Sequence, residues 1–288
     1  MTFISLFLAL GLFLLNHTDM GVVDFFHGIY LKAGLCTILA LLSIPYSAGD
    51  DFCHVSNTAF QNGETLNFKI YYALAGVYFG GGEASFSVKE EQWNGKEVYH
   101  IVGAGKTNSF VDQTFKVRDR YESFIDTGTL RPYKFIRNVH EGGTKIFEDV
   151  TFIKTANTAV TDSGVYKVPV CVQDVVSAIY SARNIDFSRY KPGDKIPFSM
   201  FLQNKVYDLY MRYIGKEVIK TKRGKFRTIK FKPLLIKGTI FESGEKMMIW
   251  ISDDAGHLPL RVESPIVVGK VSVELTGFQN LRNEFKPL

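Results

Sequence analysis

The chain has 288 residues, of which 46% are hydrophobic and 22% are charged, and its formal net charge is +5. This composition is ordinary for a globular protein, and the small positive excess argues against nucleic acid as a partner. The aromatic share of 14%, with 24 Phe and 14 Tyr, favours β-strands over helices. A chain of this length suits one large β-rich domain.

The N-terminal region has the form of a secretory signal. Lys32 precedes an apolar run over residues 35–44, and a proline and the small residues 47–49 follow it. We therefore predict a targeting region over residues 1–49 and export to the periplasm, or to a site associated with the outer membrane. The mature chain, residues 50–288, is then predicted to be a single β-rich domain.

An earlier apolar run, over residues 3–15, has no basic residue before it and makes a poor signal by itself. We expect translation to begin at Met20, so that the signal peptide covers about residues 20–49 and residues 1–19 are a start-site artefact. Both apolar runs are shorter than the roughly 20 residues that span a bilayer. A membrane-anchored hairpin is the alternative.

Two cysteines, Cys53 and Cys171, remain after the predicted cleavage. In an oxidising compartment they can form a disulfide, although the sequence alone does not bring them together. The alternative is one buried thiol and one thiol near a loose terminus.

Alternating polar and apolar residues recur along the mature chain, as in residues 66–72 and 84–89. This period of two predicts half-buried strands. Asn94-Gly95 between two such segments predicts a tight hairpin, because both central residues of that turn need positive φ. Short strands joined by tight turns predict a mainly β fold with a single antiparallel, strongly curved sheet, either an unclosed barrel or a β-roll.

One segment, from about Val172 to Arg183, has the apolar stripe of an amphipathic helix. Asp174 in its first turn suits the helix dipole. A lone central helix in a β chain must cover apolar surface, so it either plugs one end of an unclosed barrel or packs on one sheet.

No catalytic or metal-binding pattern survives inspection. Residues 103–107 end like a phosphate-binding loop, but His100 stands where that motif needs glycine, and a strand-like segment follows. The histidines after the targeting region lack metal-ligand spacing, and no Gly-x-Ser-x-Gly elbow occurs. We therefore expect no metal, no cofactor and no catalytic residue, and hence a protein that is not an enzyme.

Two charged segments carry structural expectations. In Arg118-Asp119-Arg120 a strand places both arginines on one face and Asp119 on the other, where a core position would require a partner such as Arg137. The alternative is a surface ion pair. Residues 216–237 predict a hairpin with one basic face, which either contacts an envelope protein or a membrane surface, or is a solvated edge.

Several stretches together resemble the domain-of-unknown-function 3108 family of exported proteins from Gram-negative bacteria. The stretches that carry the resemblance are Asn62–Leu66, Gly81–Ala84, Lys116–Ser123, Gln173–Arg183, Ile249–Asp254 and Leu258–Val262. The resemblance spans nearly the whole mature chain and implies export, but it implies no activity.

The closing hairpin is also similar to the end of periplasmic lipoprotein-carrier folds, which are unclosed barrels with an apolar concave face for acyl chains. This resemblance implies that inward side chains line a cavity beneath the helix; they are Phe68, Ile70, Phe86, Val88 and Trp250. The alternative is that they fill a dry core. The function expected is therefore binding or carriage of a lipid-like or other apolar small molecule, the alternative being a structural or interaction protein that acts through its outer surface.

Overall fold

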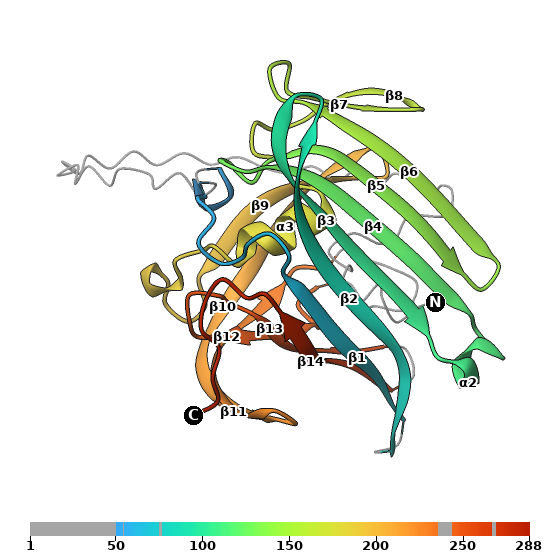
Figure 1. The fold of residues 1–288 in the computed structure, drawn as a ribbon, viewed down its shortest axis with the longest axis vertical. Coiled ribbons are helices and arrows are strands. Elements are labelled where there is room, and N and C mark those ends of the chain that lie inside the picture. Colours follow the sequence, from blue (N-terminus) through green and yellow to red (C-terminus); the bar gives the residue numbers. More distant parts are fainter. Residues whose placement is uncertain (1–49, 54, 75–76, 236–243, 267–268) are drawn as a thin grey trace, which may run out of the picture.

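Fourteen antiparallel strands form one sheet in the computed structural model, which describes residues 50–53, 55–74, 77–235, 244–266 and 269–288 (Figure 1). The strands are β1 (Thr65–Leu74), β2 (Val77–Trp93), β3 (Lys96–Thr107), β4 (Val117–Asp126), β5 (Pro132–Glu141), β6 (Thr144–Ile153), β7 (Thr158–Thr161), β8 (Gly164–Lys167), β9 (Lys195–Leu202), β10 (Lys205–Thr221), β11 (Gly224–Pro233), β12 (Met248–Ser252), β13 (Pro259–Pro265) and β14 (Lys270–Gln279). The helical elements are η1 (Asp50–Phe52), α2 (Ser109–Asp112), α3 (Val175–Ala182) and η2 (Phe187–Arg189). The predicted mainly β, antiparallel fold is confirmed, whereas the predicted targeting region, residues 1–49, lies outside the described residues.

The sheet consists of two meanders that meet through the first and last strands. Its order is β8-β7-β6-β5-β4-β3-β2-β1-β14-β13-β12-β11-β10-β9, so β1 pairs with both β2 and β14. Each meander is built from neighbours in sequence, which explains why short turns suffice to connect most strands. The predicted turn at Asn94 and Gly95 joins β2 to β3, and both residues have positive φ, at 50° and 74°.

The sheet is not closed into a barrel, and its two edge strands are β8 and β9. Side chains nevertheless bring these edges together: the Phe201 ring lies 5.6 Å from that of Tyr166 and 6.1 Å from that of Phe152. The Gln203 amide also donates a hydrogen bond to Glu148 Oε1 at 2.5 Å. The open seam therefore lies between two strands that are consecutive in the chain and are linked through α3.

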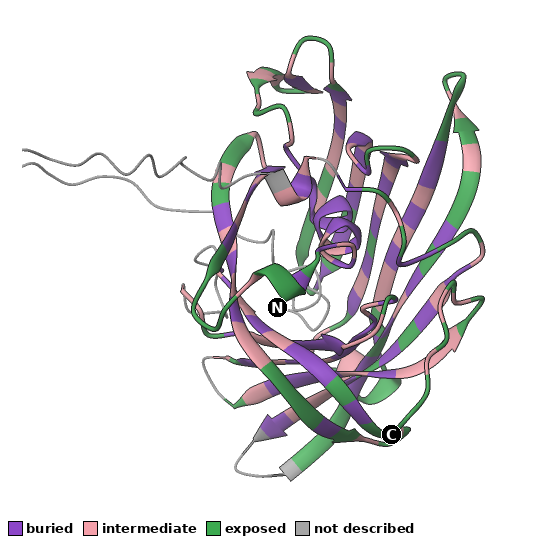
Figure 2. Ribbon diagram, turned by 90° about the vertical axis from the view of Figure 1, so that its left-hand side faces the viewer, coloured by how far each residue is buried: buried purple, intermediate pink, exposed green. Residues whose placement is uncertain are grey.

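The two meanders curve around α3, which lies against their inner face (Figure 1). The helix packs on β3, β4, β9 and η1, and Figure 2 shows it as a buried element. The Tyr180 ring packs against the rings of Phe60 and Phe86, at 4.8 and 6.2 Å between centroids. The position of α3 on the inner face supports the alternative in which the helix plugs one end of an unclosed barrel. No helix in the described part of the chain is long and apolar enough to cross a membrane.

The helix is shorter at its start than the predicted range of 172–183, because Gln173 belongs to a strand-like bridge. Its amide donates to Ser199 O and its carbonyl accepts from Phe201 N, both at 2.9 Å. The helix then begins at the N-cap Asp174, whose carboxylate accepts hydrogen bonds from the amides of Val176 and Ser177. The Asp174 amide donates in turn to the Ser177 hydroxyl oxygen, which completes a capping box.

Both ends of α3 are tied to distant parts of the chain. Ser123 on β4 donates a 2.6 Å hydrogen bond to Asp174 Oδ2. Beyond the other end, the guanidinium of Arg183 holds both carboxylate oxygens of Glu64 at 2.5 and 2.9 Å, and both side chains are almost fully buried. Arg183 also donates to the carbonyl oxygens of Ala59 and Gly256, so its buried guanidinium is hydrogen-bonded to four oxygen atoms.

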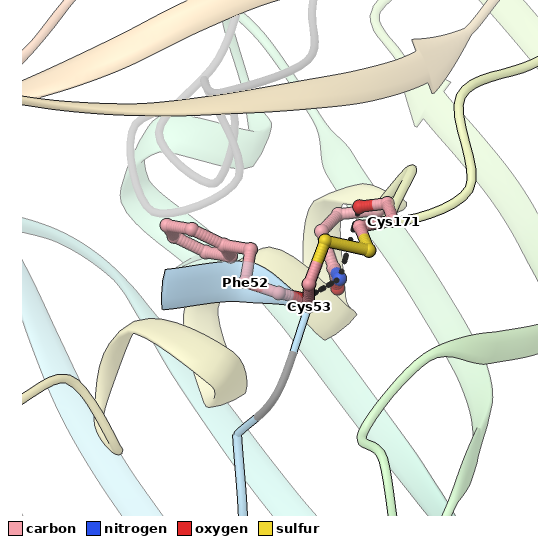
Figure 3. The surroundings of a disulfide bond; sticks show 4 residues. Phe52, Cys53 and Cys171 are labelled. Atoms are coloured by element: carbon pink, nitrogen blue, oxygen red, sulfur yellow. Dashed lines mark hydrogen bonds between the residues drawn. A yellow bond between two sulfur atoms is a disulfide. The ribbon is translucent and has the colours of Figure 1, made fainter. Parts of the chain in front are cut away.

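Cys53 and Cys171 form a disulfide, with Cα atoms 5.1 Å apart, that joins the start of the described chain to the segment before α3 (Figure 3). The Gln173 side chain donates to the carbonyl oxygens of Phe52 and Cys171, both at 3.4 Å, and so reinforces the same junction. The Phe52 ring stacks on that of Phe198 at 4.9 Å. The bond spans 118 residues, a separation at which cross-linking restricts the unfolded chain strongly.

Candidate functional site

A buried polar cluster lies on the inner face of β4, β5 and β6. Along β4 the side chains alternate, with Asp119, Tyr121 and Ser123 facing inward and Arg118 and Arg120 facing outward. The predicted split of the two arginines from Asp119 is thereby confirmed, and Asp119 faces the interior, where its exposure is 4%. The five residues that we call the inner cluster are Asp119, Tyr121, Arg137, Glu141 and Glu148.

Strand register brings the charged members of the inner cluster side by side. Tyr121 pairs with Arg137 across β4 and β5, and Arg137 pairs with Glu148 across β5 and β6. Arg137 is fully buried, and its Nη2 lies 2.7 Å from Glu148 Oε2. Because Glu148 also accepts from Gln203, the cluster is connected to the seam of the sheet.

Asp119 has a carboxylic acid as its main neighbour and not the predicted arginine. Its side chain is hydrogen-bonded to Glu141, and its Oδ1 accepts from the His140 amide at 3.1 Å. Burial and the neighbouring Glu141 raise the pKa of Asp119 to about 8, and the charge of Arg137 opposes this shift only weakly. Asp119 therefore holds a proton at neutral pH.

Three donor groups of the inner cluster, on two residues, lack acceptors within the described part of the chain. They are the hydroxyl of Tyr121 and the Nε and Nη1 groups of Arg137, and both side chains are fully buried. Burial also raises the pKa of the Tyr121 hydroxyl well above its usual range, so the hydroxyl keeps its proton as a donor. Buried donors without partners are rare in native proteins, because their desolvation is not compensated.

The cluster faces a stretch of β3 that carries no side chains on the inner face. Gly103 pairs with Tyr121, and Gly105 pairs with Asp119. A Cβ atom on Gly103 would lie 2.8 Å from Cε1 of Phe86, so this glycine makes room for the aromatic ring. The two glycines leave the inward groups of β4 without a covering neighbour on β3.

Four of the five predicted lining residues share the inner face. Phe68, Ile70, Phe86 and Val88 are each no more than 3% exposed and belong to the main hydrophobic core. Trp250 does not lie with them. It pairs with Arg261 on β13, whose partner Glu274 pairs in turn with Lys69 on the outward face.

The outward position of Trp250 has a clear local cause. On β12 Trp250 alternates with Ile249 and Ile251, and it pairs with Lys230 on β11. The indole Nε1 donates to Glu217 Oε1 at 2.5 Å, and Lys230 lies 5.3 Å from the ring centroid. Trp250 therefore combines polar and charged neighbours on the outer face with membership of the hydrophobic core cluster.

The predicted basic hairpin is formed by β10 and β11, which pair from Met211–Pro233 to Thr221–Gly224. Four of its basic side chains bond to neighbouring groups: Lys216 to Asp253, Lys222 to the Tyr71 hydroxyl, Arg223 to the Thr276 carbonyl and Lys230 to Glu217. Lys225 and Arg227 are exposed. Part of the positive charge of this hairpin thus holds neighbouring strands and loops together, which the alternation of basic and apolar residues in the sequence does not indicate.

A groove of about 780 Å³ crosses the outward face over strands β14 and β1 to β5. Its basic lining residues are Lys69, Lys106, Arg118, Arg120 and His140. Arg118 and Arg120 are ion-paired with Asp112 and Glu122, at 2.6 and 2.7 Å, and Glu83 stands between Lys69 and Lys106 in the register. The groove is therefore polar and only weakly cationic.

The family is established by a match over most of the chain. The family model described as "Protein of unknown function (DUF3108)" matches residues 67–276. This chain belongs to the DUF3108 family. The resemblance stated from the sequence is confirmed, and the matched range contains the whole inner cluster. Among curated proteins, none matches the chain.

One solved structure shares the fold at very low identity, and two others are similar at lower TM-scores. A β-barrel-like protein of the DUF1849 family from Brucella abortus has a TM-score of 0.52 and 7% identity, over 77% of this chain and 99% of that one. A protein from Bacteroides fragilis, described as exported with a YmcC-like fold, has a TM-score of 0.31 and 13% identity, over 79% and 99%. A protein from Parabacteroides distasonis, described as a lipoprotein, has a TM-score of 0.34 and 13% identity, over 78% and 99%. The Brucella structure shows that this fold occurs in another family of unknown function.

Sequence reasoning named Arg137 as a partner that Asp119 would need if it faced the core, with a surface ion pair as the alternative. It missed Tyr121, Glu141 and Glu148. A usable signal existed on β5, where the alternation of Phe135 and Val139 passes through Arg137. An arginine at an inward position of a strand is unusual enough to mark a site.

Proposed function

We propose that this DUF3108 protein is an exported envelope protein that binds an apolar, lipid-like ligand on the inner face of its curved sheet and acts as a carrier. The observation that carries the proposal is Gly105, an inward position without a side chain between Ala84 on β2 and Asp119 on β4. The Phe86 ring fills the space at Gly103, but no such ring contact accounts for Gly105 in the described part of the chain, and glycine weakens a strand interior.

The extent of the helix supports the same proposal. α3 packs above Ser123, to which Asp174 is bonded. Asp119 lies four residues further along β4, which is about 13 Å at the rise of a strand. The inner face thus continues well past the helix contact, and β3 is free of inward side chains at Gly103 and Gly105 along that length. A curved sheet with an apolar inner face is an arrangement that can hold acyl chains.

The test is to purify the protein without detergent from a Gram-negative host, extract it with organic solvent and analyse the extract by mass spectrometry. We expect an acylated compound in a near-equimolar amount. Gly105→Val should reduce the recovered amount severalfold, because its side chain fills the inner face. The matched control is Ala104→Val on the outward face, which should leave the amount unchanged. Wild-type protein that carries no apolar compound above the level of the control preparation would count against the proposal.

A second candidate function is an interaction at the outer surface, which the groove over β1 to β5 favours. An anionic envelope component would fit its lysines, Lys69 and Lys106. We expect the double variant Lys69→Glu and Lys106→Glu to abolish partner recovery after cross-linking in cells. The exposed hairpin residues Lys225 and Arg227 offer the matched charge-reversal control, since they lie outside the groove lining. If charge reversal at Lys225 and Arg227 abolishes partner recovery and reversal at Lys69 and Lys106 does not, the partner binds the hairpin and not the groove.

A further inference from the structure

The unpartnered donors of the inner cluster indicate the chemistry of a ligand. Arg137 donates at Nε and Nη1, Tyr121 donates at its hydroxyl, and neither finds an acceptor among the residues that the structure describes. The two residues face each other across β4 and β5, where paired side chains on one face lie about 5 Å apart. One oxygen atom placed between them would accept from both.

The charges around these donors restrict the kind of oxygen. Arg137 is already neutralised by Glu148 at 2.7 Å. Asp119 is hydrogen-bonded to Glu141 and keeps its proton near pH 7, because burial and Glu141 raise the pKa of Asp119 to about 8. The cluster therefore carries an excess of negative charge. Bringing a carboxylate or a phosphate into it would add an uncompensated buried charge, which is costly.

We propose that Arg137 and Tyr121 recognise the carbonyl oxygen of an uncharged acyl ester or amide, whose chain lies along the apolar inner face. This inference rests on the proposed function and names the class of its ligand. An ester or amide carbonyl accepts hydrogen bonds from both donors without bringing a charge. Gly105 adds no side chain beside Asp119, so the approach from this position of β3 is left to the chain next to the carbonyl.

Two positions nearby are consistent with an acyl chain. Phe86 and Ala84 precede the glycines in the same cross-strand rows, since Phe86 pairs with Gly103 and Ala84 pairs with Gly105. Both side chains are buried and apolar. The rows therefore run from apolar groups on β2, across glycine on β3, to polar groups on β4, which is the order of tail and head in an acyl derivative.

The experiment compares three compounds that have the same chain length but differ in the head. Delipidated protein is loaded with the fluorescent apolar probe N-phenyl-1-naphthylamine, and the probe is displaced at pH 7 by methyl laurate, laurate or dodecane. We expect methyl laurate to displace the probe at a concentration at least about tenfold lower than either other compound, since two hydrogen bonds are gained without a buried charge.

Variants separate recognition of the head from binding of the chain. Tyr121→Phe should reduce the preference for methyl laurate over dodecane about fivefold and leave dodecane unaffected. Arg137→Met made together with Glu148→Gln removes the second donor without leaving a lone charge, and should reduce the preference further. Tyr133→Phe is the matched control, because it removes a tyrosine hydroxyl that bonds to Asp126 on the outward face.

The outcomes distinguish the two proposals. If the probe does not bind and none of the compounds is retained by the wild-type protein, the proposed function fails. If the compounds bind but laurate or dodecane competes as well as the ester, only the assignment of the head is overturned. The same holds if Tyr121→Phe keeps the full preference while its circular dichroism and unfolding midpoint match those of the wild type.

Discussion

Two buried polar regions in the described part of the chain differ in how completely their hydrogen bonds are satisfied. At the ends of α3, Arg183 bonds to Glu64 and to two backbone carbonyls, and Asp174 bonds to Ser123 and to two amides of the helix. In the inner cluster, by contrast, the donors of Arg137 and Tyr121 remain open within the described chain. Both regions are equally well buried, so burial alone does not separate them.

The comparison teaches which buried polar groups support the fold. A buried group with all its partners inside the chain rigidifies the structure, and removal of one partner leaves the other uncompensated. A group with open donors gains nothing within the chain from those donors. We call the contacts of Arg183 with Glu64 and of Asp174 with Ser123 the helix anchor, and this anchor has a structural role. Both Asp174 and Arg183 lie in Gln173–Arg183, one of the stretches that carry the family resemblance. The open donors of the inner cluster therefore point to ligand binding and not to stabilisation of the fold.

The largest effect is expected for the helix anchor. Arg183→Met leaves Glu64 buried without a counter-charge, and we expect the free energy of unfolding to fall by about 4 kcal/mol. Urea denaturation followed by tryptophan fluorescence measures this change. The control is the double variant in which Glu64→Leu is added, which should recover a large part of the loss. A single variant that loses less than about 1 kcal/mol would show that the anchor is not structural.

A smaller effect is expected from the pH dependence of the inner cluster. The pKa of Asp119 is raised from 3.8 to about 8, so the folded state binds its proton more tightly than the unfolded chain does. The stability that this proton contributes is fully present below pH 3.8 and is lost as the pH rises toward 8. Between pH 6 and pH 8 we expect a loss of about 2 kcal/mol.

Asp119→Asn isolates this contribution, because an amide mimics the protonated acid and does not titrate. The variant should lose the decline between pH 6 and pH 8 that the wild type shows in urea denaturation at each pH. Parallel curves for the two proteins over this range would mean that Asp119 is ionised in the folded state.

The sequence predicts the strands and their pairing well, because alternation and the Asn94-Gly95 turn are local signals. It also predicts the helix, but not where the helix begins, since Gln173 is held by β9 through backbone bonds that only the tertiary fold creates. The face of Trp250 follows from alternation, because it lies between Ile249 and Ile251 on β12 and pairs with Lys230 on β11. The local sequence therefore contains this information, although the large apolar side chain of Trp250 suggests the inner face.

The inner cluster was only half predictable for a related reason. Arg137 was named as a partner for Asp119 for the case that Asp119 faced the core, because a buried charge needs a counter-charge. The register instead places Arg137 opposite Glu148, and Asp119 is hydrogen-bonded to Glu141. Which carboxylate lies opposite the arginine depends on how neighbouring strands are aligned, and the sequence of a single strand does not specify that alignment.

Within the helix anchor, Ser123 gives a more moderate test. Its hydroxyl donates to Asp174 Oδ2 at 2.6 Å, and both groups are fully buried. Ser123→Ala leaves that carboxylate oxygen unsatisfied, so we expect a loss of about 1.5 kcal/mol in the free energy of unfolding. The measurement is urea denaturation at pH 7.5, with Ser87→Ala on the exposed face of β2 as the control. Equal stability of the two alanine variants would mean that the Ser123 bond adds nothing.

The smallest effect is expected two residues away on the same strand and the same face. Tyr121→Phe removes a buried hydroxyl that has no partner in the described chain, so we expect the free energy of unfolding to change by less than about 0.5 kcal/mol without ligand. With methyl laurate at saturation, the wild type should gain more stability than the variant, because only the wild type donates this bond to the ester. Thermal unfolding with and without the ester measures both quantities. A ligand-free loss above about 1.5 kcal/mol would reveal a partner within the fold, and Tyr121 would then belong with the helix anchor as a structural group.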